Sequence, residues 1–205
     1  DYYRNPVLIL GDGLIGQMME PVEFAEGREP IKELPPKDWA ATGNDGSKPR
    51  SVINSLFLDP EELERHNYHL KEKYDRMERD EVRFETSGLD ADYDLLVVAY
   101  GTVARVCSTA IEELADRGVK VGMVRPVSLF PYPYRAVREA ARKAKAVLVV
   151  ELSMGQMIED VRLAIEGSKP LHFLNRTGGM LVSPDEVVDK IQAISEGSSQ
   201  EVVHA

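Results

Sequence analysis

The stretch Ala146-Val-Leu-Val-Val-Glu-Leu-Ser-Met-Gly-Gln-Met-Ile-Glu-Asp-Val161 decides the fold of this chain. Its aliphatic run is typical of a strand buried on both faces, as in a parallel sheet covered by helices. A short turn then leads into an amphipathic helix. Ligands and partners of open α/β sheets gather at the carboxyl ends of the strands, where this unit places Glu151, Ser153 and Gln156.

Strand and helix patterns alternate on both sides of this stretch. Residues 94–100, 119–124 and 171–174 are apolar strand candidates, and amphipathic helix patterns lie between and after them. A shorter strand is expected at 82–86. Such alternation favours an α/β fold with a mostly parallel sheet, right-handed crossovers and helices on both faces.

The N-terminal part is organised differently. Residues 6–10 predict a strand and residues 14–24 a helix that is kinked near Pro21. No second strand follows for some sixty residues, so we interpret 1–24 as the tail of another sheet. Residues 25–81 are expected to be a linker made of a Pro/Gly-rich loop and a charged helix that begins at Asp59. Residues 82–197 then form the α/β domain, and 198–205 fray.

Composition excludes several classes of function. The net charge of −10 and the isoelectric point near 5.0 argue against nucleic acid and anionic membranes as main partners. No apolar run approaches the length of a membrane span, and the first residues do not resemble a signal peptide. The single cysteine, Cys107, permits no internal disulfide and cannot alone hold zinc or an iron–sulfur cluster. We therefore expect a soluble, cytoplasmic protein.

Two cofactor motifs are incomplete near the N-terminus. Gly11-Asp-Gly13-Leu-Ile-Gly16 matches the Gly-x-Gly-x-x-Gly dinucleotide fingerprint, but the second strand ending in an acid is missing. Gly11, Asp12 and Gly13 also resemble the start of a thiamine-diphosphate motif, with Asn44 as the later magnesium ligand. A nicotinamide or flavin module remains one alternative. A tight turn without a ligand is the simpler interpretation.

The strand ends hold the other candidate residues, which form an expected rim: Gly101, Thr102, Arg125, Glu151, Ser153, Gln156, Arg176, Gly178 and Gly179. Two arginines and a glutamate at one rim could bind an anion, or Arg125 could pair with Glu151. His66 and His69 lie one helical turn apart without a third metal ligand. Cys107 lies on an apolar stripe, where an inert thiol is expected. We predict no catalytic residue and no metal site on this chain.

Several motifs are distributed along nearly the whole chain. They are Tyr3-Arg-Asn-Pro-Val-Leu-Ile-Leu-Gly-Asp-Gly-Leu-Ile-Gly-Gln-Met-Met-Glu-Pro-Val-Glu-Phe24, Trp39, Arg50-Ser-Val-Ile-Asn-Ser-Leu56, Asp59-Pro-Glu-Glu-Leu63, Val97-Val-Ala-Tyr-Gly-Thr-Val-Ala-Arg105, Arg125-Pro-Val-Ser-Leu-Phe-Pro131, Glu151-Leu-Ser-Met-Gly-Gln-Met157 and Arg176-Thr-Gly-Gly179. Taken together, these motifs resemble the alpha subunit of 2-oxoacid:ferredoxin oxidoreductases of the branched-chain, 2-ketoisovalerate type.

The resemblance implies a fold and a reaction. The family decarboxylates a 2-oxoacid on thiamine diphosphate with magnesium, forms acyl-CoA and passes electrons through iron–sulfur clusters to ferredoxin. Residues 82–197 would resemble the transketolase C-terminal domain, a three-layer α/β/α sandwich of five strands whose first strand is antiparallel. The strands at 94 and 146 would then lie side by side. Residues 1–24 would end a preceding pyrimidine-type thiamine domain.

The same resemblance places the chemistry outside residues 1–205. In the family, the cofactor-activating glutamate belongs to the N-terminal part of the alpha subunit, the Gly-Asp-Gly magnesium site belongs to a different subunit, and the clusters also lie elsewhere. We therefore expect this C-terminal portion to bind no cofactor alone. Its expected partners are a thiamine-binding beta subunit and a ferredoxin-like subunit. We expect it to serve assembly through the rim; a free-standing interaction domain is a further alternative.

Overall fold

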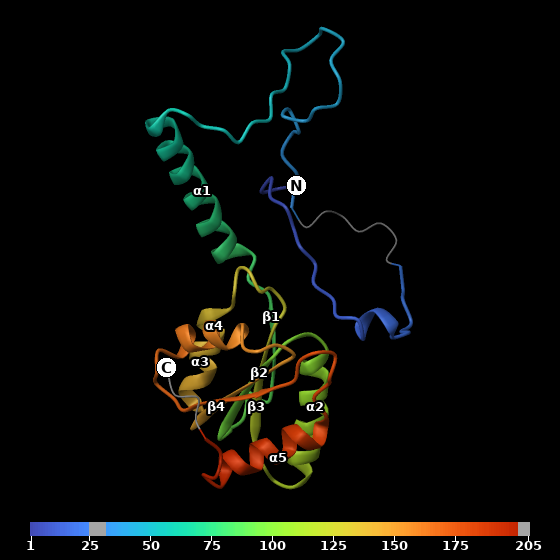
Figure 1. Ribbon diagram of the computed structural model, residues 1–205, viewed down its shortest axis with the longest axis vertical. Coiled ribbons are helices and arrows are strands. Elements are labelled where there is room, and N and C mark those ends of the chain that lie inside the picture. Colours follow the sequence, from blue (N-terminus) through green and yellow to red (C-terminus); the bar gives the residue numbers. More distant parts are fainter. Residues whose placement is uncertain (25–31, 201–205) are drawn as a thin grey trace. The chain divides into compact units, whose positions relative to one another are not determined.

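The computed structural model describes residues 1–24 and 32–200 and divides the chain into two compact units (Figure 1). One unit consists of Asp1–Leu10 and Met18–Arg76, and the other consists of Gly11–Gln17 and Met77–Ala205. Helix α1, Pro60–Asp80, begins in the first unit and ends in the second. All the strands of the described chain belong to the second unit, which is therefore the α/β body.

The body is built on a five-stranded sheet in the order β1-β3-β2-β4-β5 (Figure 1). The strands are β1 (Phe84–Ser87), β2 (Leu95–Ala99), β3 (Val121–Pro126), β4 (Ala146–Glu151) and β5 (Leu171–Asn175). β1 is antiparallel to β3, and every other pair is parallel. The predicted sheet with an antiparallel first strand, and the neighbouring strands at 94 and 146, are confirmed.

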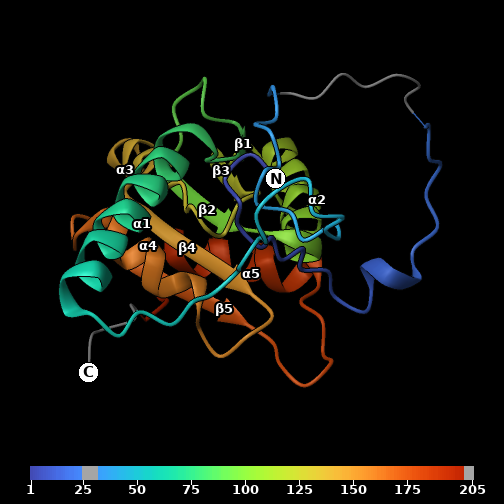
Figure 2. The same cartoon turned by 90° about the horizontal axis from the view of Figure 1, so that it is seen from above.

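Two layers of helices cover the sheet, as seen from above in Figure 2. Helices α3 (Tyr134–Lys143) and α4 (Met157–Ile165) cover one face, and α2 (Gly101–Asp116) and α5 (Pro184–Ser195) cover the other. β4 contributes side chains to the hydrophobic core on both sides of the sheet, because successive side chains of a strand point to opposite faces. Val147 and Val149 belong to the α3–α4 core, whereas Leu148 and Val150 belong to the α2–α5 core.

Local sequence signals fix where several helices begin. Ser183 and Glu186 form the predicted capping box of α5, since each side chain accepts the backbone N–H of the other residue. At α1, the Asp59 carboxylate accepts the N–H of Glu62 at 2.8 Å. The single inverted strand β1 is held by its pairing with β3, with Glu85 opposite Arg125.

The predicted elements at the N-terminus are not formed. Residues 6–10 contain no strand, and only the short 3-10 helix η1, Ile15–Gln17, replaces the expected helix at 14–24. The aliphatic side chains of residues 7–10 are 66% to 90% exposed. A strand forms only against a neighbouring strand that satisfies its backbone groups, and the described residues offer none at this segment.

Candidate functional site

The carboxyl ends of β2 and β4 meet at the point where the chain changes direction across the sheet. From β2 the chain passes to β3 on one side, and the next crossover places β4 on the other side. Ala99 pairs with Val150, so Tyr100 and Glu151 leave the sheet next to each other. Burial and the charge of Glu151 raise the pKa of Tyr100. The part of the predicted rim that follows β2 and β4 thus lies at the topological switch point of the sheet.

Glu151 fills the N-terminus of α4 with its own carboxylate. The side chain is 1% exposed and accepts the backbone N–H groups of Gln156, Met157 and Ile158 at 3.1 to 3.2 Å. The Ser153 hydroxyl donates a further hydrogen bond at 2.9 Å. A helix N-terminus is a natural anion site because its first N–H groups have no partner within the helix. At α4, Glu151 occupies that site.

The loop between Glu151 and α4 is shaped for this contact. Ser153 Oγ accepts the N–H of Gly155 at 3.0 Å, and the Ser153 carbonyl accepts the Asn175 amide of β5 at 2.7 Å. Gly155 has a φ of +110°, and a Cβ at this position would lie 3.1 Å from Ile158. Glycine is required there because L side chains avoid this backbone region. The loop therefore has little freedom to release Glu151.

The rim arginines have other partners than the sequence suggested. Arg125 donates to Glu85 of β1 at 2.9 Å, so the predicted ion pair between Arg125 and Glu151 is wrong. Arg176 pairs with Glu186 in the first turn of α5. The physical reason is competition, since backbone N–H groups satisfy Glu151 while the cross-strand neighbour of Arg125 is itself acidic.

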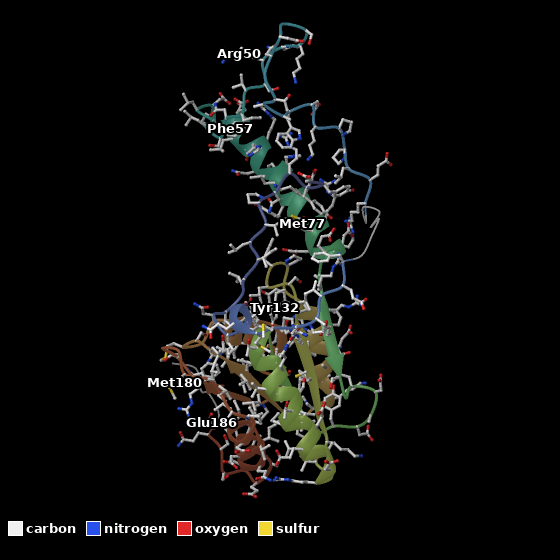
Figure 3. The ribbon with its side chains drawn as sticks, turned by 90° about the vertical axis from the view of Figure 1, so that its right-hand side faces the viewer. Arg50, Phe57, Met77, Tyr132, Met180 and Glu186 are labelled. Carbon is white, nitrogen blue, oxygen red and sulfur yellow. The ribbon has the colours of Figure 1, made fainter. Side chains whose placement is uncertain are left out.

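The remaining rim residues form the surface around Glu151. Thr102 is buried in the first turn of α2, and Gly101 opens that helix with a φ of +60°. The Gln156 side chain is exposed. Gly178 and Gly179 both have positive φ in the exposed loop after β5, which leads to Met180 (Figure 3). The strand ends bring the candidate rim residues to one edge of the body, and their role in binding or assembly stays a prediction.

Large apolar side chains are exposed along the same edge. Val127, Phe130, Met154, Met180 and Leu181 lie in the loops that follow β3, β4 and β5 and are 47% to 82% exposed. By contrast, the loops at the opposite edge, residues 88–94, 117–120, 144–145 and 166–170, expose no large apolar side chain. Among the loops of the body, exposed large apolar side chains therefore gather at one edge, which is typical of a contact with another protein surface.

The N-terminal cofactor motifs do not have the structure that a cofactor requires. Within the described residues 1–24, no strand leads into Gly11 and no α-helix begins at Gly16, so the nicotinamide or flavin alternative lacks its βα turn. The Asp12 carboxylate accepts the N–H of Ile15 at 2.8 Å, and this bond is the main cause of its lowered pKa. Asn44 accepts the N–H of Gly46 within its own turn. Each of these two side chains thus accepts a backbone N–H of its own turn, and Thr102 of α2 further lowers the pKa of Asp12.

The other candidates have ordinary surroundings. The rings of His66 and His69 lie 6.3 Å apart between centroids, and within residues 1–24 and 32–200 no group of three metal-ligating side chains is found. Burial raises the pKa of the Cys107 thiol to about 12, which is unsuited to a nucleophile. None of the described helices is both long and apolar enough to cross a membrane.

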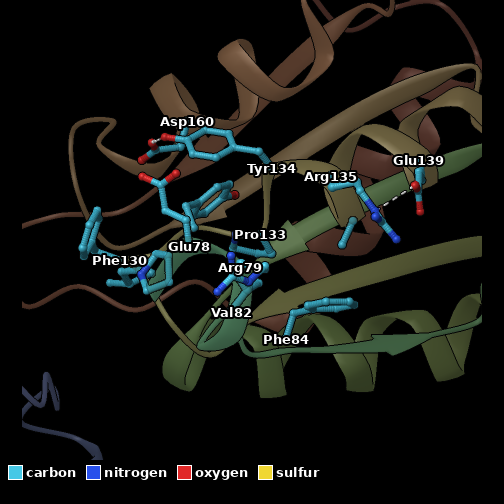
Figure 4. A pocket seen from close by; sticks show the side chains of 14 residues that line it. Glu78, Arg79, Val82, Phe84, Phe130, Pro133, Tyr134, Arg135, Glu139 and Asp160 are labelled. Carbon is cyan, nitrogen blue, oxygen red and sulfur yellow. Dashed lines mark hydrogen bonds and ion pairs between the residues drawn. The ribbon is translucent and has the colours of Figure 1, made fainter. Parts of the chain in front are cut away.

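A recess beside the rim was not predicted from the sequence (Figure 4). It has a volume of about 740 Å³ and is lined by the end of α1, β1, the loop after β3, the start of α3 and Asp160 of α4. Tyr132 and Tyr134 stack edge to face in its wall, with ring centroids 5.0 Å apart. We call it the tyrosine recess. The sequence signal that could have indicated it is Pro131-Tyr-Pro-Tyr134, which places two tyrosines at the start of α3.

Comparison with known proteins relates both units to one family of enzymes. Residues 93–187 match the family described as pyruvate:ferredoxin oxidoreductase core domain II. The ketoisovalerate oxidoreductase subunit VorB of Methanothermobacter thermautotrophicus is 41% identical over 199 residues, which are 97% of this chain and 55% of that subunit. The 2-oxoglutarate synthase subunit KorA of Methanothermobacter marburgensis is 27% identical over 94% of this chain and 57% of that subunit.

A solved structure supports the fold. A chain of the 2-oxoglutarate:ferredoxin oxidoreductase from Magnetococcus marinus superposes with a TM-score of 0.60 and 19% sequence identity, covering 75% of this chain and 28% of that chain. That structure has 2-oxoglutarate, coenzyme A and succinyl-CoA bound. The present chain spans about half the length of the curated relatives that it matches.

Proposed function

This chain belongs to the family of 2-oxoacid:ferredoxin oxidoreductase subunits, and we propose that it is the C-terminal portion of an alpha subunit specific for 2-ketoisovalerate. The observation that carries the proposal is the 41% identity to a ketoisovalerate oxidoreductase subunit along 97% of the chain. The identity to the 2-oxoglutarate synthase subunit is lower, at 27%. The whole enzyme would convert the 2-oxoacid to acyl-CoA and reduce ferredoxin.

Within that enzyme we assign this portion to assembly. The described residues do not fit thiamine diphosphate and its magnesium ion, because Asp12 and Asn44 each accept an N–H of their own turn. An anion at α4 would have to displace Glu151 from three backbone N–H groups. Two features support assembly: the exposed apolar loops at the carboxyl edge and the exposed aliphatic run at residues 7–10.

The run at residues 7–10 would complete a sheet outside the described structure. Its aliphatic side chains are those of a strand covered on both faces, yet they are exposed here. We propose that this segment pairs with strands of a pyrimidine-type thiamine domain. The other partners are a thiamine-binding subunit and a ferredoxin-like subunit, which would hold the cofactors and clusters.

Affinity purification of the tagged protein from its own cells tests this function. We expect a thiamine-binding subunit and a ferredoxin-like subunit to co-purify. The complex should reduce methyl viologen only with coenzyme A, and faster with 2-ketoisovalerate than with 2-oxoglutarate or pyruvate. A preference for 2-oxoglutarate would contradict the assigned substrate, and activity without any other subunit would contradict the assigned role.

Calorimetry on the isolated chain tests its share in the cofactor site. We expect no magnesium-dependent binding of thiamine diphosphate in the micromolar range, since the diphosphate finds no free helix N-terminus at α4. NADH binding that is lost in Gly13→Val would instead favour a nicotinamide module. Binding of either cofactor with micromolar affinity would refute the assembly role.

A further inference from the structure

The tyrosine recess lies entirely within the α/β body and combines aromatic walls with two carboxylates. Figure 4 shows Glu78 from the end of α1 and Asp160 from α4 on the side of the recess that Tyr134 lines. The Tyr134 hydroxyl donates to Asp160 at 2.5 Å. The pKa of Tyr134 is raised to about 12, mainly by this hydrogen bond and further by the charges of Asp160 and Glu78. Both carboxylates therefore act on the same phenol.

Neither carboxylate has a cationic partner among the described residues. Within the part of the chain that the structure describes, Glu78 and Asp160 form no ion pair. The arginines that line the recess do not compensate for them, because Arg79 pairs with Asp80 at 2.9 Å and Arg135 pairs with Glu139 at 3.2 Å (Figure 4). Two like charges near one phenol without a counter-ion favour the approach of a cation.

Tyr132 contributes an uncharged aromatic ring to the wall of the recess. The residue is 5% exposed, and its hydroxyl is buried. Burial, followed by the charges of Asp160 and nearby groups, raises its pKa, so the phenol stays neutral. The negative charge at the recess therefore comes from the carboxylates and not from this phenol.

The walls suit a planar cation. Tyr132 and Tyr134 meet edge to face, and Phe130 and Phe84 are exposed at 61% and 44% around them. Aromatic faces attract cations, and a guanidinium group stacks on such faces while its N–H groups reach carboxylates. A primary ammonium lacks the planar stacking surface.

We propose that the tyrosine recess receives an arginine side chain of the protein that covers the carboxyl-edge loops. The guanidinium group would lie against the tyrosine rings and donate to Asp160 and Glu78. A protein is favoured over a free small molecule because Phe130, which is exposed and lines the recess, belongs to the same loop after β3 as the exposed Val127. Aromatic residues and arginine are also enriched where proteins meet. The inference rests on the proposed function only in taking that protein to be another part of the oxidoreductase.

Titration of the whole chain with N-acetyl-arginine amide, followed by aromatic NMR shifts of tyrosine, tests the proposal. We expect saturable shifts of Tyr132 and Tyr134 and an affinity about fivefold tighter than for N-acetyl-citrulline amide, the neutral analogue of nearly equal shape. Added salt should weaken the arginine probe, because Glu78 and the recess mouth are open to solvent. The lysine probe, Nα-acetyl-lysine amide, should bind more weakly than the arginine probe.

Matched variants separate this site from general attraction to an acidic protein. The double variant Glu78→Gln and Asp160→Asn should lose most of the preference for arginine over citrulline and keep its far-UV spectrum. Glu112→Gln removes an exposed carboxylate of α2 outside the recess and should change nothing. Equal binding of arginine and citrulline, tighter binding of lysine, or an unchanged double variant would each overturn the proposal.

The probe experiment is independent of the oxidoreductase assay. If the arginine probe binds as expected but no oxidoreductase subunit co-purifies with the protein, the proposed function fails and the arginine site stands. If the subunits co-purify but the recess shows no preference for arginine, the arginine site fails and the proposed function stands.

Discussion

Residues 147–150 and 7–10 are two aliphatic runs of similar composition, Val-Leu-Val-Val and Val-Leu-Ile-Leu, with opposite surroundings. Each side chain of the first run is 0% exposed, whereas those of the second are 66% to 90% exposed. The first run pairs with β2 and β5, and the second has no strand neighbour in the described chain. An aliphatic run therefore favours burial, but whether it is buried depends on the strands that are available to pair with it.

Leu148→Ala should give the largest effect, because it removes a side chain from the packed α2–α5 core. We expect the free energy of unfolding to fall by about 2 to 5 kcal/mol. Urea unfolding followed by circular dichroism measures it. Leu163→Ala on α4, where the side chain is 64% exposed, is the matched control and should cost less than about 0.5 kcal/mol. Equal effects of the two variants would show that burial does not distinguish them.

Glu151→Gln should have the second largest effect on stability, because it keeps the side-chain shape but replaces one acceptor oxygen by an NH₂ group. That group would face backbone N–H groups of α4 that now donate to the carboxylate. We expect a loss of about 2 kcal/mol in the free energy of unfolding and faster amide hydrogen exchange at Met157 and Ile158. Glu159→Gln, in the exposed first turn of α4, should cost about 0.5 kcal/mol. A Glu151→Gln effect as small as that of Glu159→Gln would refute the capping role.

The buried thiol of Cys107 should make the free energy of unfolding depend on pH in the alkaline range. Its thiol ionises near pH 9 in the unfolded chain and at about 12 in the folded chain, because burial disfavours the thiolate. Stability is unaffected below pH 9, where both states are protonated, and falls as pH rises toward 12, since only the unfolded state releases the proton. The slope from this group should approach about 1.4 kcal/mol per pH unit.

Unfolding midpoints between pH 8 and 11 measure this slope. Cys107→Ala is the control, because it leaves the ionisation of every tyrosine in place and removes only the thiol. The variant should be less stable than the parent at pH 7 and lose stability more gradually above pH 9. Identical pH profiles for the two proteins would show that ionisation of the Cys107 thiol is not coupled to unfolding.

The α/β body could be predicted because its signals are local. Each of these signals depends only on residues that are close together in sequence. They are aliphatic runs such as 147–150, amphipathic stripes and the Ser183–Glu186 capping box. The order of the strands came from the resemblance to a known family, since periodicity alone does not choose neighbours. The N-terminal strand and helix were predicted by the same local rule and are not formed in the described residues, which offer that segment no sheet neighbour.

The site was predicted only in part. Sequence placed Glu151 at a strand end, but its partner depends on the loop geometry at Gly155, which turns α4 so that three N–H groups face the carboxylate. An ion pair with Arg125 was the expected alternative and is wrong. The tyrosine recess was missed because Glu78, Tyr132 and Asp160 lie far apart in sequence and meet only through the fold.

Leu8→Ala should have the smallest effect on the isolated chain and gives the sharpest test of the comparison. The side chain is 80% exposed, so its removal should change the free energy of unfolding by less than about 0.5 kcal/mol, against about 2 to 5 for Leu148→Ala. In the assembled enzyme the same change should lower the yield of co-purified subunits, because residues 7–10 would there be buried in a sheet.

Limited proteolysis should also cleave residues 1–80 of the isolated chain well before 90–196. A cost in the isolated chain like that of Leu148→Ala, or equal protection of both regions, would mean that this chain buries the run by itself. The exposed run would then need no partner, and assembly would rest on the carboxyl-edge loops alone.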